Sequence, residues 1–213
     1  METTNTIIIG ASAAGLACAA QLEKRGISYK IIEKHSHVAH AWRNHYDRLH
    51  LHTHKHASDL PFVKFPKKTP KYPAKHKVVQ YLENYCNTLG IRPSFNVKAA
   101  KIQKVDDTWV IHTNNGTIKS NNVIICTGNT NRPKKYTKTG LESFSGTILH
   151  SSEYKNGQVF KGKKVLVVGF GNSAGEIAMC LHEHGAKPTL SVRSPVNIIP
   201  RDILGIPVLQ ISI

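Results

Sequence analysis

The stretch IIIGASAAGLACAAQL, residues 7–22, decides the fold of this chain of 213 residues. Residues 6–9 form a short, apolar, β-branched run that is typical of a buried parallel strand. Gly10 permits a tight turn after this run, and from Ala13 onward small and apolar residues recur at helical spacing. The stretch therefore predicts a strand, a turn and a helix.

The residues that follow complete a β-α-β unit. Gly26 comes just after the helical pattern and is a typical C-terminal stop. A second strand is predicted over residues 29–32, and it ends on Glu33. An acidic side chain in this place can accept hydrogen bonds from the ribose hydroxyls of an adenosine.

The glycine spacing of the first turn predicts a dinucleotide site. Gly10 makes the turn, Ser12 is small enough for a pyrophosphate to approach, and Gly15 lets the helix pack closely on the strand. The helix N-terminus adds unpaired N–H groups and partial positive charge. The alternative is a β-α-β turn that binds nothing. The predicted contact residues are Gly10, Ser12, Ala13, Ala14, Gly15 and Glu33.

A second unit, KVLVVGFGNSAGEIAMCL at residues 164–181, repeats the pattern with all three glycines. Its second strand, predicted over residues 189–192, ends on Arg193 instead of an acid. Because an arginine can pair with a 2′-phosphate that a carboxylate would repel, this turn favours NADPH over NADH. The alternative is that Arg193 is a solvated surface charge. The predicted contact residues are Gly169, Gly171, Asn172, Ser173, Ala174, Gly175 and Arg193.

A helix and a β-rich section separate the two units. Residues 75–89 carry apolar side chains at helical spacing. Residues 109–113 and 117–119 predict a hairpin around the Asn-Gly turn of residues 114–116. Residues 123–126 predict a further buried strand.

Composition narrows the functional classes. With 40% hydrophobic and 20% charged residues, the chain is typical of a globular protein, and no apolar run is long enough to span a membrane. The four cysteines are scattered through apolar segments and the N-terminus is polar, so we expect reduced thiols in a cytoplasmic protein. The net charge of +16 favours anionic partners, among them nucleic acid, anionic membranes and dinucleotide phosphates.

Two local patterns have alternative interpretations. Four histidines alternate between His50 and His56 and could bind a transition metal, although no carboxylate or cysteine completes a site, so we predict no metal. Residues 64–77 hold six lysines and could contact nucleic acid. They contain no motif of a nucleic-acid-binding module, so we expect a solvated basic face and no nucleic-acid partner.

The segment FSGTILHSSEYK, residues 144–155, carries the most selective motif. It matches F-x-G-x-x-x-H-x-x-x-Y-K at every fixed position, and VIICTGNTNRP and GFGNSAGEIA flank it as a Thr-Gly motif and an NADPH turn. In this order the motifs resemble the flavin-containing monooxygenases, closest to the YUCCA-type indole-3-pyruvate monooxygenases. The fixed positions are Phe144, Gly146, His150, Tyr154 and Lys155.

The resemblance implies an α/β flavoprotein fold with two Rossmann-like dinucleotide-binding units, the second of them incomplete. FAD would bind the first turn and NADPH the second. The implied domains are an FAD-binding domain over residues 1–155, with its C-terminal portion absent, and an incomplete NADPH-binding domain over residues 156–213. Family members continue well beyond the second turn, so we expect a fragment or a truncated gene product that exposes apolar strand edges.

The resemblance also implies the chemistry. NADPH would reduce FAD, the reduced flavin would take up O2 to give a C4a-(hydro)peroxyflavin, and one oxygen atom would pass to a small organic substrate. The YUCCA-like branch acts on 2-oxo acids, which makes that substrate class the expectation. The alternatives are another FAD- and NADPH-dependent oxidoreductase, or a non-catalytic truncated remnant that binds FAD. The sequence does not indicate an oligomeric state.

Further site residues follow from the resemblance. His52 stands where classical members have an asparagine near the flavin, and it is the candidate catalytic residue. Trp42 would pack beside the flavin or in the core. The remaining implied cofactor-binding residues are Thr127 and Gly128 of the Thr-Gly motif, and His150 and Tyr154 at the junction of the domains and the NADP site.

Overall fold

The computed structural model describes residues 2–129, 132–134, 137 and 139–208. The chain forms two compact units. The first contains Met1–Asn44 and Lys55–Arg132, and the second contains His45–His54 and Pro133–Ile213. The main boundary between the two units follows Arg132, and the short segment His45–His54, which comes earlier in the sequence, is part of the second unit. The predicted division at residue 155 into FAD- and NADPH-binding domains stays a prediction.

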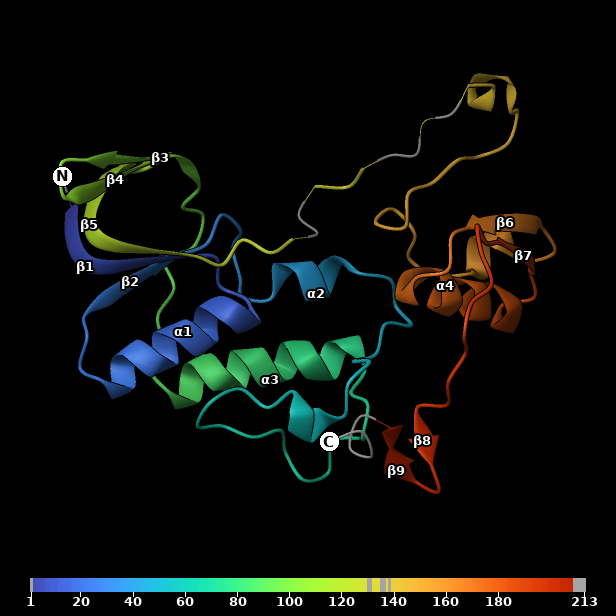
Figure 1. Ribbon diagram of the computed structural model, residues 1–213, viewed down its shortest axis with the longest axis horizontal. Helices are drawn as coiled ribbons and strands as arrows, with labels where there is room; N and C mark the ends of the chain where they lie inside the picture. Colours follow the sequence, from blue (N-terminus) through green and yellow to red (C-terminus); the bar gives the residue numbers. More distant parts are fainter. Residues whose placement is uncertain (1, 130–131, 135–136, 138, 209–213) are drawn as a thin grey trace. The chain divides into compact units, whose positions relative to one another are not determined.

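The first unit is built on a five-stranded mixed sheet in the order β2-β1-β5-β4-β3 (Figure 1). β1 pairs in parallel with β2 and with β5, whereas β4 is antiparallel to both β5 and β3. α1 (Ala13–Lys24) connects β1 to β2 and completes the predicted β-α-β unit. The strands are β1 (Glu2–Ile9), β2 (Tyr29–Ile32), β3 (Ala99–Val105), β4 (Thr108–Thr113) and β5 (Gly116–Ile125).

The isoleucines of β1 form the centre of this unit because both faces of the strand are covered. A Cβ atom at Gly15 of α1 would lie 3.4 Å from Ile8 Cγ2, so Ile8 faces the helix. Ile7 and Ile9 point to the other face and pack with a cluster from β4 and β5 that includes Ile111 and Ile118. Burial on both faces explains why the strand is a continuous apolar run without alternation.

α3 (Lys75–Thr88) confirms the predicted helix to within one residue. It lies beside α1 and α2 (His40–Asn44) in the first unit (Figure 1). A short 3-10 turn, Lys55–Ala57, precedes it. The Tyr81 hydroxyl accepts the Leu60 N–H at 2.7 Å and donates to Val63 O at 2.6 Å, so α3 also fixes the loop before it.

The hairpin differs from its prediction in two ways. Thr113 pairs with Gly116, so the two-residue turn is Asn114–Asn115, and Gly116 takes a φ of 105° at the start of β5. The separate buried strand predicted over residues 123–126 is wrong, because β5 runs unbroken to Ile125 and that side chain is 64% exposed. The strand continues because β1 pairs with it from Ile118 to Ile125, well beyond Ser120, the last residue that pairs with β4.

The second unit repeats the β-α-β order. β6 (Lys164–Val168) and β7 (Lys187–Ser191) form a parallel pair joined by α4 (Asn172–Glu183). The two strands agree with the predicted α/β class with two Rossmann-like units. β7 begins and ends earlier than the predicted range of residues 189–192. Two 3-10 turns, Leu141–Ser143 and Gln158–Phe160, precede β6.

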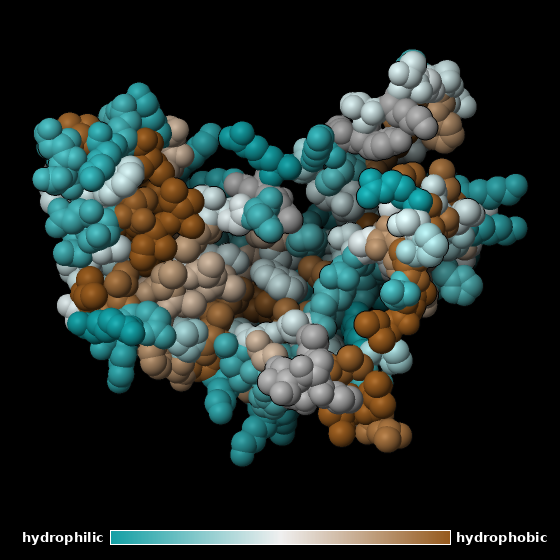
Figure 2. Space-filling model, viewed as in Figure 1, coloured by the Kyte–Doolittle hydropathy of each residue, from teal (hydrophilic) through white to brown (hydrophobic). Residues whose placement is uncertain are grey.

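The second unit also contains a short hairpin that the sequence did not predict. β8 (Asp202–Ile203) pairs with β9 (Ile206–Pro207), and both turn residues, Leu204 and Gly205, have positive φ. Positive φ at both central positions is the geometry of a tight hairpin turn. Figure 2 shows hydrophobic residues over β8 and β9, where Leu204 is 97% exposed.

One face of the β6–β7 sheet is apolar and open. Val165 and Val167 of β6 are half-buried, whereas Leu166 and Val168, which point to the opposite face, are 63% and 61% exposed. Leu190 of β7 is exposed as well. As for membranes, none of the helices described here has both the length and the apolar character needed to cross one.

Candidate functional site

The first glycine turn is closed so tightly that it admits no side chain at two positions. Gly10 has a φ of 110°, and its N–H donates to Ile32 O at 2.8 Å. A Cβ atom on Gly10 would lie 2.4 Å from Cys126 O, and one on Gly15 would lie 1.9 Å from Gly10 O. The backbones of the strand, the turn and the helix therefore lie too close together for any side chain at these two positions. This close packing is the geometry of a dinucleotide-binding fingerprint.

Ser12 shows why the middle position need not be glycine. Its φ of −115° and ψ of −167° are extended angles that any residue adopts. Ser12 precedes α1 without capping it through its side chain, and its carbonyl accepts the Leu16 N–H at 2.9 Å. The N–H groups of the first helical turn, at Ala13, Ala14 and Gly15, therefore have no intrahelical acceptor and can serve an anion.

Glu33 holds the turn together from the end of β2. Its side chain is 9% exposed, Oε2 accepts the Ala11 N–H at 2.9 Å, and Oε1 accepts the His35 N–H at 3.0 Å. A carboxylate offers about four acceptor positions. Glu33 can therefore bridge these two loops and still accept hydrogen bonds from ribose hydroxyls.

Next to Glu33 lies a histidine cluster that the sequence reasoning missed. The rings of His35 and His40 stack, and His40 Nδ1 lies 3.2 Å from His37 Nε2. Burial lowers the pKa of both His35 and His40 below the ordinary value of 6.5. The only sequence signal was the local run of histidines between residues 35 and 45. Trp42, in α2 beside this cluster, is half-buried.

The thiols of Cys18 and Cys126 meet in the first unit although they are far apart in sequence. Burial, together with a hydrogen bond to Cys18, raises the pKa of Cys126 to about 11. Both residues are half-buried, and all four cysteines are free. Beyond Cys126, Thr127 and Gly128 are exposed, and Gly128 has a φ of 78° that suits the predicted turn.

The second glycine turn has the same backbone course but is far more open. Gly169 has a φ of 104°, and its N–H donates to Ser191 O at 2.8 Å, as Gly10 does to Ile32. Gly171 precedes α4 with extended angles, φ −86° and ψ 177°. A Cβ atom on Gly169, Gly171 or Gly175 would meet no described atom within 4 Å.

The register of β7 moves Arg193 by one position. Ile9 pairs with Ile32 in the first unit, and Val168 pairs with Ser191 in the second. The residue after Ser191, Val192, is therefore the counterpart of the residue after Ile32, which is Glu33. Arg193 comes one position later than the sequence comparison placed it, and it is exposed.

Segment His45–His54 is joined to α4 by charged groups. Arg48 donates to both carboxylate oxygens of Glu183 at 2.9 Å and also binds Glu176 Oε2. Glu176 and Glu183 are seven residues apart and therefore lie on one face of the helix. The hydrogen bond to Glu183 raises the pKa of Arg48, and in turn lowers the pKa of Glu183. No pattern in the sequence indicated that Arg48 would contact α4.

Glu176 is the buried centre of this charge network. It is 7% exposed, and its Oε1 accepts a hydrogen bond from Arg201 Nη2 at 2.8 Å. The same Arg201 nitrogen lies 3.4 Å from His52 Nδ1. Burial, then the nearby Arg201 charge, lowers the pKa of His52. His52 Nε2 is buried and has no hydrogen-bond partner among the described residues.

Tyr154 of the Phe-Gly-His-Tyr-Lys motif lies in an aromatic cluster. It is 5% exposed, and its ring centroid lies 6.5 Å from Tyr46 and 6.0 Å from Phe160. Burial, then the neighbouring Cys180 thiol, raises the pKa of the Tyr154 hydroxyl, and this hydroxyl makes no hydrogen bond of normal geometry with the described residues. A buried polar atom without a hydrogen bond lowers the free energy of unfolding by about 1–3 kcal/mol. Such an atom often pairs with a bound ligand or an ordered water. His150 is half-buried, and its Nδ1 lies 2.9 Å from Ser152 Oγ.

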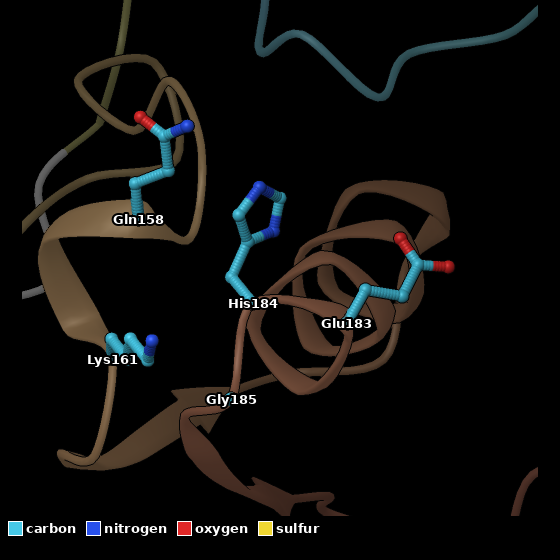
Figure 3. Close-up of a pocket in the computed structure, with 5 residues that line it drawn as sticks. All are labelled: Gln158, Lys161, Glu183, His184 and Gly185. Atoms are coloured by element: carbon cyan, nitrogen blue, oxygen red, sulfur yellow. The ribbon is translucent and has the colours of Figure 1, made fainter.

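A groove of about 480 Å³ lies at the C-terminal end of α4 (Figure 3). His184 faces it and donates from Nδ1 to Cys180 O at 2.7 Å, while Glu183 points away from His184. Helix C-termini carry partial negative charge, so this end of α4 does not favour a phosphate. The glycine turn is at the other end of the helix. The groove is lined by Gln158, Lys161, Glu183, His184 and Gly185.

The alternating histidines do not form one row. His50, His52 and His54 belong to the second unit and His56 to the first. His50 Nδ1 donates to Arg48 O at 2.6 Å, and His56 lies 3.5 Å from Asp59. Over the described residues, no group of three or more histidine, cysteine or acidic side chains could hold a metal ion.

The lysine-rich stretch folds around a lysine that precedes it. Lys55 is 7% exposed, and its Nζ donates to Lys67 O at 2.8 Å and Thr69 O at 2.6 Å. Of the six lysines in residues 64–77, five are exposed and Lys75 is half-buried. The stretch is thus a loop, followed by the start of α3, with a mostly exposed basic surface, and the buried Lys55 ammonium group holds the backbone of this loop.

Comparison with known proteins places this geometry in a family. Residues 7–201 match the pyridine nucleotide-disulphide oxidoreductase family model. The probable indole-3-pyruvate monooxygenase YUCCA4 of Arabidopsis thaliana is 39% identical over 94% of this chain and 49% of its own length. The flavin-containing monooxygenase of Stenotrophomonas maltophilia has a TM-score of 0.89 and 25% identity over 95% of this chain and 62% of that protein.

A more distant structure shares the fold. OTEMO, solved in complex with FAD and NADP, has a TM-score of 0.73 and 22% identity, with coverage of 90% of this chain and 39% of OTEMO. The chain spans about half the length of the curated relatives that it matches. The chain belongs to the pyridine nucleotide-disulphide oxidoreductase family and is similar to the N-terminal half of the YUCCA-type monooxygenases.

Proposed function

We propose that this chain provides the FAD site and part of the NADPH site of a flavin-dependent monooxygenase. The observation that carries the proposal is the repeated turn: Gly10 and Gly169 take nearly the same φ, and each donates its N–H to the end of the neighbouring strand. Two such turns in one chain suit two dinucleotides. The similarity to YUCCA-type enzymes over 94% of the chain supports a monooxygenase within this family.

FAD fits the first turn. The absence of room for a Cβ atom at Gly10 and Gly15 leaves backbone at the surface that a pyrophosphate would approach. Glu33 supplies an acceptor for the adenosine ribose, with its own position fixed by the Ala11 N–H. Trp42 is proposed to pack beside the flavin, and Thr127 and Gly128 of the Thr-Gly motif are proposed to contact the cofactor.

NADPH is proposed for the second turn. The start of α4 offers N–H groups to the pyrophosphate, with the flanking residues Gly169, Gly171 and Gly175 leaving open space. Arg193 is exposed just past β7, where a flexible guanidinium can reach a 2′-phosphate. The contact residues proposed with them are Asn172, Ser173 and Ala174.

The chemistry would come from the flavin, which, once reduced by NADPH, activates O2 and passes one oxygen atom to a small organic substrate. The protein binds and orients the cofactors and keeps water away from them. Tyr154 and His150 are proposed to organise the NADP side, since the buried Tyr154 hydroxyl lacks a partner among the described residues. His52 is proposed as the residue at the flavin. The substrate class proposed is a 2-oxo acid, after the indole-3-pyruvate named for the relatives.

Visible spectroscopy of the purified chain tests the proposal. Bound flavin is expected to give a yellow protein that bleaches when NADPH is added without oxygen. With air and a 2-oxo acid, NADPH consumption is expected to yield an oxygenated product. Reduction of the flavin without oxygenation of any 2-oxo acid would instead indicate a reductase. A colourless protein that gains no flavin on incubation with FAD would contradict the proposal.

The cofactor preference has its own test. Replacing Arg193→Gln is expected to weaken NADPH binding about tenfold or more, because a charge-assisted hydrogen bond contributes about 1.5–3 kcal/mol. NADH binding should change little, since it has no 2′-phosphate. Arg25→Gln, at an exposed arginine after α1, is the matched control for loss of one positive charge. Equal weakening by both variants would refute a specific contact.

A further inference from the structure

His52 has one ring nitrogen with a defined neighbour and one without. Nδ1 lies 3.4 Å from Arg201 Nη2, whereas Nε2 is buried and has no hydrogen-bond partner in the part of the chain that is described. Buried polar atoms are nearly always paired, and an exception in a native structure is often completed by a ligand or water. The pairing of Nδ1 determines what Nε2 can offer.

The neighbour of Nδ1 fixes the tautomer. An arginine guanidinium donates hydrogen bonds and cannot accept them. A proton on Nδ1 would therefore face a second N–H group and a positive charge. The neutral imidazole carries a single proton, so that proton belongs on Nε2. Burial and the Arg201 charge both lower the pKa of His52, which keeps the ring neutral near pH 7.

Arg201 is itself held in place by a buried carboxylate. Glu176 Oε1 accepts from Arg201 at 2.8 Å, and Glu176 Oε2 is bound by Arg48. Arg48 is anchored in turn by Glu183 on the same face of α4. The charged or titratable groups that act on His52 are thus Arg201, Glu176 and the neighbouring His50.

We propose that Arg201, held by Glu176, is a positioning residue that keeps His52 as an Nε2–H donor toward an acceptor oxygen of a bound ligand. The oxygen belongs to the flavin or to the carboxylate or keto group of a 2-oxo acid, which share acceptor chemistry. The ligand part rests on the proposed function, whereas the tautomer is a property of this chain alone. An asparagine in place of His52 would still offer an N–H donor, but Arg201 would no longer determine which nitrogen carries the proton.

Nitrogen NMR of the whole chain with ring-labelled histidine tests the tautomer, with His52→Gln identifying the resonance. The expected pattern has Nε2 protonated and Nδ1 bare at pH 7.5. In Arg201→Met, the Nδ1–H form is expected to appear and the pKa of His52 to rise, because a positive charge and a donor are lost. Arg201→Lys retains both and should restore the original pattern.

The matched control is Arg92→Met, which removes an exposed arginine of the first unit and should leave the His52 signals unchanged. Glu176→Gln gives a second variant, because a neutral amide holds Arg201 less strongly: the Nδ1–H form is expected to appear as in Arg201→Met, whereas loss of the carboxylate charge removes an influence that raises the pKa of His52. A protonated Nδ1 in the unaltered protein would overturn the proposal. Tautomer signals that are equal in the unaltered protein and Arg201→Met would overturn it as well.

The ligand is identified by two additions followed at the His52 Nε2–H resonance. A shift on loading with FAD assigns the acceptor to the flavin, and a shift only on adding indole-3-pyruvate to the loaded protein assigns it to the substrate. No shift with either removes the ligand role of His52. If the chain takes up no FAD, the proposed function fails, while the tautomer measurement still decides the role of Arg201.

Discussion

At the scale of single residues, Glu33 shows how a ligand-binding carboxylate is prepared by the fold. Its two oxygens accept the N–H groups of Ala11 and His35, so the side chain is oriented whether or not a ribose is present. A residue that is already fixed loses little conformational freedom when it binds. We therefore expect a change at Glu33 to affect both stability and cofactor binding.

The replacement Glu33→Gln tests this double role. One amide N–H₂ must face a backbone N–H, which leaves a buried donor unpaired and is expected to lower the free energy of unfolding by about 1–3 kcal/mol. FAD affinity should fall as well. Urea unfolding followed by tryptophan fluorescence is the measurement, because both tryptophans, Trp42 and Trp109, belong to the first unit. The exposed Glu23→Gln in α1 is the control, and an equal loss in both variants would argue against the role.

Three half-buried histidines predict a dependence of stability on pH. The pKa values of His35, His40 and His52 lie below 6.5 in the folded chain, so the unfolded chain binds more protons than the folded one as the pH falls. The stability present above pH 6.5 is therefore lost as the pH decreases through that value toward the lowered pKa values. Glu142 and Glu183, whose pKa values are lowered, change the free energy of unfolding only near and below pH 4.5.

Urea unfolding at pH 7.5 and pH 5.5 measures this effect, with lower stability expected at pH 5.5. In His40→Asn the difference between the two pH values should shrink, since one of the groups is removed. His76→Asn, at an exposed position of α3, should keep the full difference. Stability that rises on acidification to pH 5.5 would contradict the assignment.

At the scale of elements, the two glycine turns share a backbone but differ in packing. Gly15, at the last position of the first glycine turn, has no room for a Cβ atom, whereas at its counterpart Gly175 an added Cβ atom would meet no described atom within 4 Å. The same replacement should thus have opposite effects in the two helices.

Gly15→Ala is expected to destabilise the first unit by about 3 kcal/mol or more, because α1 must move away from the backbone of the turn. Gly175→Ala is expected to stabilise α4 by about 0.5–1 kcal/mol, the usual gain of alanine over glycine within a helix. Amide hydrogen exchange in α1 and α4 measures each effect locally. A large loss of protection in α4 of Gly175→Ala would show that this position is crowded after all.

These elements also show how far the sequence could lead. Isoleucine and glycine spacing predicts both β-α-β units, because buried parallel strands and tight turns leave short-range patterns. The contacts of Arg48 with α4, more than 120 residues away, leave no such pattern, and neither does the choice of Lys55 over its neighbours as the buried lysine. The join of two predicted strands into β5 was missed because it depends on pairing with β1 and β4.

At the scale of the whole molecule, surface hydrophobicity is concentrated in the second unit. Leu166 and Val168 on β6 and Leu204 in the β8–β9 turn are among its most exposed apolar residues. Exposed apolar strands are prone to association with other chains. This surface should control the solubility of the chain more than its net charge of +16 does.

The double replacement Leu166→Lys and Val168→Lys is therefore expected to reduce both light scattering and binding of a hydrophobic dye at a given concentration. The inward-facing side chains of β6 are untouched, so α4 should keep its hydrogen-exchange protection. Lys161→Gln with Lys163→Gln, at two exposed lysines just before β6, is the control for altered charge. Unchanged scattering in the double variant would mean that another surface drives association.

The placement of His45–His54 in the second unit has a consequence for how the chain can be divided. The backbone passes between the units three times, after Asn44, after His54 and after Arg132. A protease that cuts the chain near Arg132 leaves His45–His54 on the N-terminal piece, and the contacts of this segment with α4 should keep the two pieces together in gel filtration under native conditions. A recombinant protein that ends near Arg132 would lack α4, so Arg48 and Tyr46 would lose their partners in that helix. Because each unit is made from two separate stretches of the sequence, no single continuous piece of the gene encodes either unit. Genetic recombination could therefore not transfer either unit as one continuous segment.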